Sequence, residues 1–96
     1  MNIDDNEKKL NTIAAMLRAL GHPDRLRILA CLIREECYVK NLAEEIGLPQ
    51  STVSQHLRVM TDRGILVGER EGVKVCYKPA SPLAEEIAEL LFADCD

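Results

Sequence analysis

A tight break at residues 47–49 limits the possible folds of this chain more than any other feature. Gly47 can end a helix, because glycine tolerates the left-handed conformation that follows a last helical turn. Pro49 cannot continue a helix but suits the first turn of a new one. Apolar residues recur at helical spacing on both sides of the break, namely Leu42, Ala43 and Ile46 before it and Val53, Leu57 and Met60 after it. The pattern predicts two short helices joined by a tight turn, a helix-turn-helix.

The second of these helices carries hydrogen-bonding side chains on its outer side. At about 100° per residue, they project away from Val53 and Leu57. Such groups can bind base edges or phosphates, whereas a generic amphipathic helix more often carries Glu and Lys there. We therefore predict that DNA is contacted by Gln50, Ser51, Thr52, Gln55 and Arg58, with Ser54 at the flank.

A β-hairpin is predicted directly after this helix. Two runs rich in β-branched residues flank Glu71-Gly72, where glycine can supply the positive φ of a tight turn. A hairpin that follows a recognition helix is a wing. Arg70 and Lys74 flank its tip and Lys78 closes it, so three cations are expected to lie against phosphates. A small sheet capping the core is the alternative, and the two roles are compatible.

The net charge of −4 is unevenly distributed along the chain. Residues 50–78 hold five cations and three acids, so this segment is +2 and the remainder is −6. Acidic residues near the end of the chain are expected to keep phosphates away from that side. Because bulk attraction to DNA is weak, binding should depend on base contacts and on dimer symmetry.

Three motifs together resemble the ArsR/SmtB family of winged-helix repressors. They lie at residues 20–29, at residues 42–57 and at residues 70–77, in the family's order and spacing. The resemblance covers about the whole chain after the first dozen residues. It implies a mainly α winged helix-turn-helix with four helices, a two-stranded β-hairpin and a fifth helix, in that order. It also implies a homodimer that binds double-stranded operator DNA and releases it when an inducer binds.

The length of 96 residues fits a single domain over 1–96. We expect the helix-turn-helix at about 39–62 and the wing at about 64–78. Two further helices, at about 6–20 and 81–94, would complete the monomer core or form a dimer interface. We favour the interface, because a winged helix already has a core from its central helices and hairpin. Their apolar residues are Leu10, Ile13, Ala14, Leu17 and Leu20, and then Leu83, Ile87, Leu90 and Leu91.

The chain shows no run of 18 or more apolar residues, and its acidic amino end does not resemble a signal peptide. We therefore expect a cytoplasmic protein with no membrane partner. In that compartment the cysteines would be reduced at rest. They are then free thiols, metal ligands or redox switches rather than a disulfide framework. The four are Cys31, Cys37, Cys76 and Cys95.

The resemblance leaves the inducer open, because the family's sensing sites vary. A zinc site on the last helix would need histidines there, but the two histidines are His22 and His56. A cysteine-rich site entering the helix-turn-helix is also unlike this chain, which has Tyr38 and Lys40 at those positions and Cys37 one residue earlier. No metal ligand set is certain, and no cofactor is required.

A third family arrangement joins a cysteine in the second helix to one at the end of the last helix. Cys31 and Cys95 resemble this pair, each about one residue out of register. We expect the slip to turn Cys31 toward Arg27 and Arg34, where exposure and positive charge favour a thiolate. The core face of that helix would then be Leu26, Leu29, Leu32 and Ile33. Alternatively, Cys31 is a small apolar residue on a lightly packed face.

Two of the cysteines are assigned different roles. Cys37 could join Cys31 and Cys95 as a third thiolate for As(III) or Sb(III), because thiolates are soft ligands. Cys76 replaces an aromatic residue of the family's hairpin and is expected to be structural.

The two histidines are expected to serve the fold. His22 precedes Pro23 and Asp24, which fit the first turn of a helix, so it should shape the preceding turn. His56 lies at the edge of the inner face of the recognition helix and is expected to be partly buried and hydrogen-bonded rather than in contact with DNA.

No nucleophile, base and orienting group can be assembled, and no glycine-rich phosphate loop is present, so we do not expect an enzyme. Two functions remain from the sequence. One is a repressor released from its operator by a thiol-dependent signal, either a soft metalloid such as arsenite or an oxidant or reactive sulfur species. The other is a winged-helix module without a sensing role, acidic enough to bind a basic protein.

Overall fold

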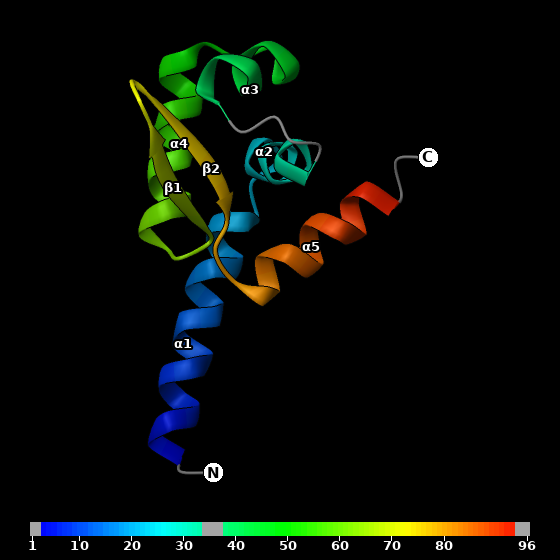
Figure 1. Cartoon of the computed structure of the whole chain (residues 1–96). Coiled ribbons are helices and arrows are strands. Elements are labelled where there is room, and N and C mark those ends of the chain that lie inside the picture. Colours follow the sequence, from blue (N-terminus) through cyan, green and yellow to red (C-terminus); the bar gives the residue numbers. More distant parts are fainter. Residues whose placement is uncertain (1–2, 34–37, 94–96) are drawn as a thin grey trace.

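The computed structural model describes residues 3–33 and 38–93 of the chain. Five helices and one hairpin follow in the predicted order, which confirms the mainly α winged helix-turn-helix (Figure 1). The elements are α1 (Ile3–Leu20), α2 (Pro23–Ile33), α3 (Val39–Ile46), α4 (Gln50–Asp62), β1 (Leu66–Glu71), β2 (Lys74–Pro79) and α5 (Pro82–Ala93).

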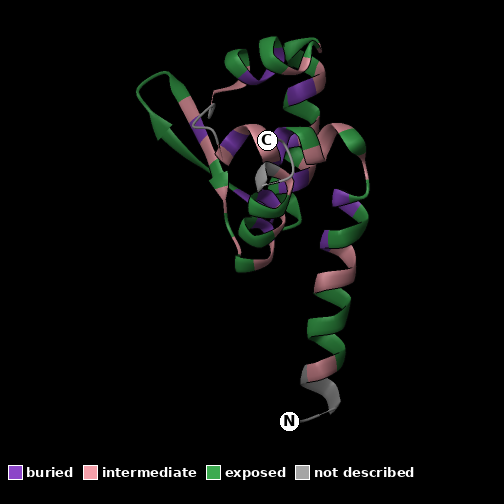
Figure 2. Ribbon diagram, turned by 90° about the vertical axis from the view of Figure 1, so that its right-hand side faces the viewer, coloured by how far each residue is buried: buried purple, intermediate pink, exposed green. Residues whose placement is uncertain are grey.

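α2 is the central helix of the core. It packs against all four other helices and against β2. Ile28 and Leu29 of this helix are completely buried, as are Leu42 of α3 and Leu57 of α4. Each such side chain contributes roughly 1.5–3 kcal/mol of transfer free energy relative to an exposed one. The buried residues lie mainly in the body of the molecule, around α2 (Figure 2).

The environment of Cys31 differs from the prediction. Ile28 is buried, whereas Leu26 and Ile33 are only half-buried. Cys31 is half-buried and packs against the core, so it does not turn fully away from the core and fits the alternative of a small apolar residue on a lightly packed face. The reason is that α2 has neighbours on several sides, and a single apolar stripe underestimates how much of its circumference they cover. Arg34 lies outside the described residues.

His22 organises the start of α2. Its Nδ1 accepts the N–H of Asp24 at 3.1 Å. Its carbonyl accepts the N–H groups of Arg25 and Leu26. These bonds satisfy amides that a first helical turn leaves without partners. The predicted role of His22 in shaping this turn is confirmed.

α1 extends well beyond the body of the molecule (Figure 1). Leu20 at its end is buried in the core, but Leu10 and Leu17 are 59% and 48% exposed. On α5, Leu83 and Ile87 pack against the core, whereas Leu90 is 67% exposed. The two terminal helices thus divide their apolar residues between the core and the surface. Within the described chain, no helix is both long and apolar enough to cross a membrane.

Candidate nucleic-acid interface

The turn between α3 and α4 has the conformation that its residues predict. Gly47 adopts a φ of 81°, and its N–H donates to the carbonyl of Ala43 at 2.8 Å. The N–H of Leu48 donates to the same carbonyl at 3.2 Å. Pro49 then precedes α4 with an extended backbone, and its carbonyl accepts the N–H of Val53. The turn therefore ends one helix and starts the next within three residues.

α4 presents a polar row to solvent. Val53, Leu57 and Met60 are completely buried, which directs the opposite side of the helix outward. No side chain of the row forms a hydrogen bond or ion pair with another described residue. Of the α4 residues predicted to contact DNA, Thr52 is half-buried and the others are exposed. The exposed members are Gln50, Ser51, Ser54, Gln55 and Arg58.

His56 joins α4 to the core instead of facing solvent with this row. It is half-buried, and its Nδ1 accepts a hydrogen bond from Nε of Arg25 at 3.2 Å. Nη1 of Arg25 also donates to the carbonyl of Ala19 at 3.2 Å. Burial, followed by the charges of His22 and Arg25, lowers the pKa of His56 below the ordinary 6.5. The prediction of a partly buried, hydrogen-bonded histidine is confirmed.

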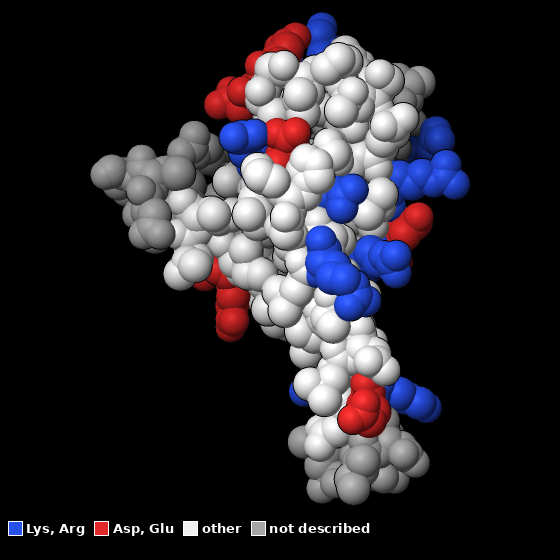
Figure 3. All heavy atoms as spheres, turned by 180° about the vertical axis from the view of Figure 1, so that it is seen from behind, with Lys and Arg blue, Asp and Glu red and all other residues white. Residues whose placement is uncertain are grey.

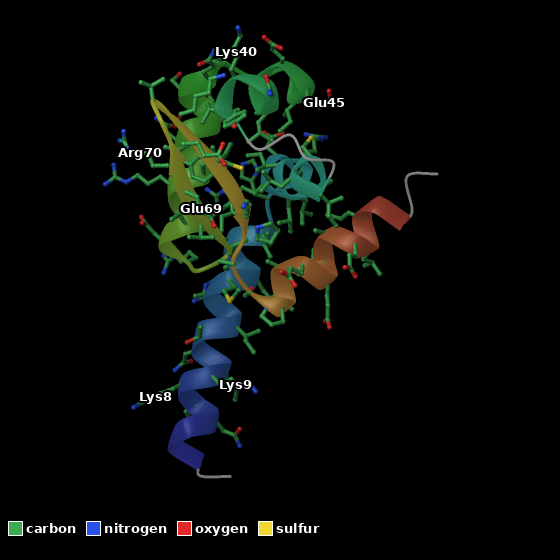
Figure 4. All side chains as sticks on the ribbon, viewed as in Figure 1. Lys8, Lys9, Lys40, Glu45, Glu69 and Arg70 are labelled. Atoms are coloured by element: carbon green, nitrogen blue, oxygen red, sulfur yellow. The ribbon has the colours of Figure 1, made fainter. Side chains whose placement is uncertain are left out.

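The hairpin forms a wing beside α4. β1 and β2 are antiparallel, with Glu71 opposite Lys74. Gly72 turns the tip with a φ of 66°, and Val73 beside it is 96% exposed. An apolar side chain this exposed at a loop tip has no role in the core. Arg70 extends away from the hairpin (Figure 4), with no ion-pair partner among the described residues.

Tyr38 connects the wing to the start of the helix-turn-helix. Its hydroxyl donates a hydrogen bond to the carboxylate of Glu71. The ammonium of Lys74 lies 5.0 Å from the centre of its ring. This cation–π contact leaves Lys74 exposed and adjacent to the tip.

Lys78 differs from the other two cations of the wing. It lies opposite Val67, away from the tip, and its ammonium donates to the carboxylate of Glu69 at 3.2 Å. This hydrogen bond raises the pKa of Lys78. The three cations thus lie where they were predicted, Arg70 and Lys74 near the tip and Lys78 at the closing end, but Lys78 is paired with an acid.

Comparison with known proteins identifies the family to which the chain belongs. A family described as a helix-turn-helix domain matches residues 20–69. The chain is 33% identical over 92 residues to the biofilm growth-associated repressor of Xylella fastidiosa, which covers 96% of this chain and 81% of that protein. The solved structure of reduced HlyU from Vibrio cholerae has a TM-score of 0.84 at 29% identity, with 98% of this chain and 100% of that chain covered.

A second solved structure carries the family name. It is a homodimeric winged helix-turn-helix DNA-binding domain from Mycobacterium bovis, described as a possible ArsR-family transcriptional regulator. Its TM-score is 0.81 at 26% identity, and the alignment covers 100% of this chain and 89% of that one. The chain belongs to the ArsR/SmtB family of winged-helix regulators. The Xylella fastidiosa relative is described as a repressor, and the Mycobacterium bovis domain as a possible transcriptional regulator.

Gly68 is a wing residue of this ArsR/SmtB protein that sequence reasoning missed. A Cβ atom built at Gly68 would lie 2.9 Å from Cγ1 of Val75 and 3.1 Å from Cε1 of Tyr77. The absence of a side chain therefore allows Tyr77 to pack across the hairpin. Tyr77, Gly68 and Val75 line a cleft of about 430 Å³ whose other wall contains Ser54 and Arg58 of α4. A glycine within a strand is the one sequence signal for such a close approach.

The candidate sensing residues of this family member are only partly described. Cys31 is half-buried, whereas Cys76 is buried, as expected for a structural cysteine. Cys37 and Cys95 lie outside the described residues.

His22, Asp24 and His56 are the described residues whose metal-binding atoms converge, within 4.8 Å of one another. Nδ1 of each histidine, however, accepts an N–H hydrogen bond. A neutral ring of this kind carries its proton on Nε2. Ligation through either nitrogen would require the loss of an existing bond or a tautomer change. Asp24 also binds Arg27 at 2.6 Å. These contacts favour a structural junction over a metal centre.

Proposed function

We propose that the protein is a transcriptional repressor that binds operator DNA through the exposed row of α4. The observation that carries this proposal is that Gln50, Ser51, Ser54, Gln55 and Arg58 share one side of the helix and have no partners among the described residues. Amide and guanidinium groups in a major groove can bind adenine and guanine in a bidentate manner. Arg70 and Lys74 of the wing would contact flanking phosphates.

The repressor is proposed to act as a homodimer. Leu10 and Leu17 of α1 and Leu90 of α5 are exposed apolar residues on helices at the chain ends. Burying them against a second copy would remove apolar area from water. The related domain from Mycobacterium bovis is described as homodimeric. A two-fold dimer would present its recognition helices to half-sites about one helical turn apart.

The signal that releases the DNA is proposed to depend on thiols. Cys31 and Cys95 form the primary pair, with Cys37 as a third ligand in the case of As(III) or Sb(III). The related HlyU structure is described as the reduced form of that protein. A bond between α2 and the chain end beyond α5 would bias the dimer angle and so the spacing of the recognition helices.

Operator binding is tested by gel shift on DNA from the promoter of the protein's own gene, with scrambled duplexes of equal length as controls. Specific binding is expected to exceed binding to scrambled DNA by at least about 10³-fold. Equal retardation of both duplexes would contradict the proposal and leave the non-sensing protein-interaction module.

The signal is tested on preformed complexes of wild type, Cys31→Ser and Cys95→Ser. Arsenite under reducing conditions should release the wild type if thiolates ligate the metalloid. Release by peroxide or an organic persulfide, reversed by a dithiol, would instead indicate a redox bridge. If both variants respond as the wild type does, the thiol signal is wrong while operator binding stands.

A further inference from the structure

Three arginines line a small cleft between α1 and the end of α4. Arg18 lies in the last turn of α1, Arg25 on α2, and Arg63 directly after α4. The cleft has a volume of about 180 Å³. Its remaining lining is small and apolar, and consists of Ala15, Ala19 and Val59.

Arg25 is held in one orientation within this cleft. Its Nε donates to His56 of α4, and its Nη1 donates to the carbonyl of Ala19 at the end of α1. A guanidinium carries five N–H donors in a rigid plane. Two are used by these bonds, so about three are left for a ligand. Because the side chain is already ordered, little further conformational entropy would be lost when a ligand binds.

The described acids form no ion pair with the arginines of the cleft, although a carboxylate oxygen of Asp24 lies within 4.8 Å of a ring nitrogen of His56, the residue to which Arg25 donates. The carboxyl ends of α1 and α4 lie close to Arg18 and Arg63 and supply a partial charge of roughly −0.5 each. About one negative charge from the helix ends, together with the carboxylate of Asp24 that is itself paired with Arg27, then opposes three guanidinium groups. The cleft thus keeps a clear excess of positive charge.

One face of the molecule carries many cations. Lys and Arg atoms gather in the middle of the face shown in Figure 3 and along the edge on its right-hand side. Most acidic atoms lie at the upper left and on the lower part of that face, and one acidic group lies between the cations on the right-hand side. An anion that approaches this face therefore meets a positive potential.

We propose that this cleft binds a phosphate group. Its volume is below the range of sites for drug-sized ligands, which begin at about 300 Å³, and suits a single oxyanion. Three arginines lining one cleft can offer more donors than a carboxylate with two oxygens accepts, and so match a tetrahedral dianion with several acceptor oxygens better. The phosphate comes either from the DNA backbone or from a free phosphate-bearing molecule.

A phosphate bound here would bridge three elements of the fold. It would contact α1, α2 and the residue that ends α4, and Arg25 already links these through His56 and Ala19. The recognition helix would then be held in a defined position relative to α1, the helix proposed to form the dimer. Phosphate binding and DNA binding would therefore influence each other.

The first arm of the test titrates inorganic phosphate into the protein without DNA, at constant ionic strength, with chloride as the reference. Amide NMR signals of Ala15, Ala19 and Val59 should shift and saturate. The double variant Arg18→Gln, Arg63→Gln should weaken phosphate binding at least about tenfold. Both side chains are exposed, so the fold should persist. Lys9→Gln, at the far end of α1 (Figure 4), should bind phosphate as the wild type does.

The second arm measures operator affinity against salt concentration and rests on the proposed operator binding. If a backbone phosphate fills the cleft, the double variant should lower the log–log salt slope by about one or two. Lys9→Gln, far along α1 (Figure 4), should not change it. An unchanged slope with saturable phosphate binding would assign the site to a free phosphate-bearing molecule.

Absence of saturable phosphate shifts together with an unchanged salt slope would overturn the assignment. Absence of operator binding by the wild type would instead contradict the proposed function, and the assignment would then be decided by the titration without DNA.

Discussion

Gln55 is the side chain whose replacement best separates base reading from general attraction to DNA. It is exposed on α4 and forms no hydrogen bond with another described residue. Gln55→Ala should cost roughly 1–3 kcal/mol of binding free energy on the operator and much less on random DNA. Titration gel shifts on both duplexes measure the difference. Equal losses on the two duplexes would mean that Gln55 does not read bases.

His56 should make the stability of the fold depend on pH. Burial, with the charges of His22 and Arg25, lowers the pKa of His56 in the folded chain below 6.5. As pH falls, the unfolded chain therefore binds this proton first, and the free energy of unfolding decreases from about pH 6.5 downward. The contribution of the neutral His56 ring to the free energy of unfolding is fully present above about pH 6.5.

Urea midpoints measured between about pH 7.5 and 5.5 test this dependence. The decline with falling pH should be smaller in His56→Gln than in the wild type. Parallel curves for the two proteins would show that His56 is not the group responsible.

At the scale of elements, the wing depends on the close contact at Gly68. Gly68→Ala would place a Cβ atom 2.9 Å from Cγ1 of Val75, a stiff β-branched side chain. We expect a loss of roughly 1–3 kcal/mol in the free energy of unfolding, as for other overpacked sites. Because Tyr77 would also be displaced toward α4, operator affinity should fall.

Gly21→Ala is the matched control for the wing variant, since its added Cβ would meet only carbonyl oxygens at 3.4 and 3.5 Å. Urea unfolding of the two variants and the wild type gives the comparison. If both substitutions have the same small effect, the hairpin accommodates a side chain at Gly68 and the packing argument is wrong.

At the scale of the whole molecule, the exposed stripe of α1 should determine the oligomeric state. Leu17→Glu would place a charge in the proposed interface and should convert the dimer to a monomer near the chain mass of 10.7 kDa. Light scattering at micromolar concentration measures this mass. Thr12→Glu lies about 200° around the helix from Leu10 and should leave the dimer intact. If the wild-type protein is a monomer and still binds the operator, the proposal of a homodimer is contradicted.

The helix-turn-helix was predictable from the sequence because it depends on local chemistry, whereas the full order of elements was implied by the family resemblance. Gly47 and Pro49 mark a helix end and a helix start whatever surrounds them. The spacing of Val53, Leu57 and Met60 likewise identifies the inner side of α4 and, by elimination, its outer row. The role of His22 could also be inferred, because it directly precedes the first turn of a helix. That of His56 followed from its position at the edge of the inner face of α4.

Contacts between distant segments were decided by the tertiary structure. The burial of Cys31 depends on the neighbours that surround α2, which no single helical stripe specifies. The pairing of Lys78 with Glu69 depends on the hairpin register. The arginine cleft joins residues 18, 25 and 63, which are far apart in the chain and share no motif. Helix periodicity reports which side of an element is apolar, whereas packing alone determines what that side meets.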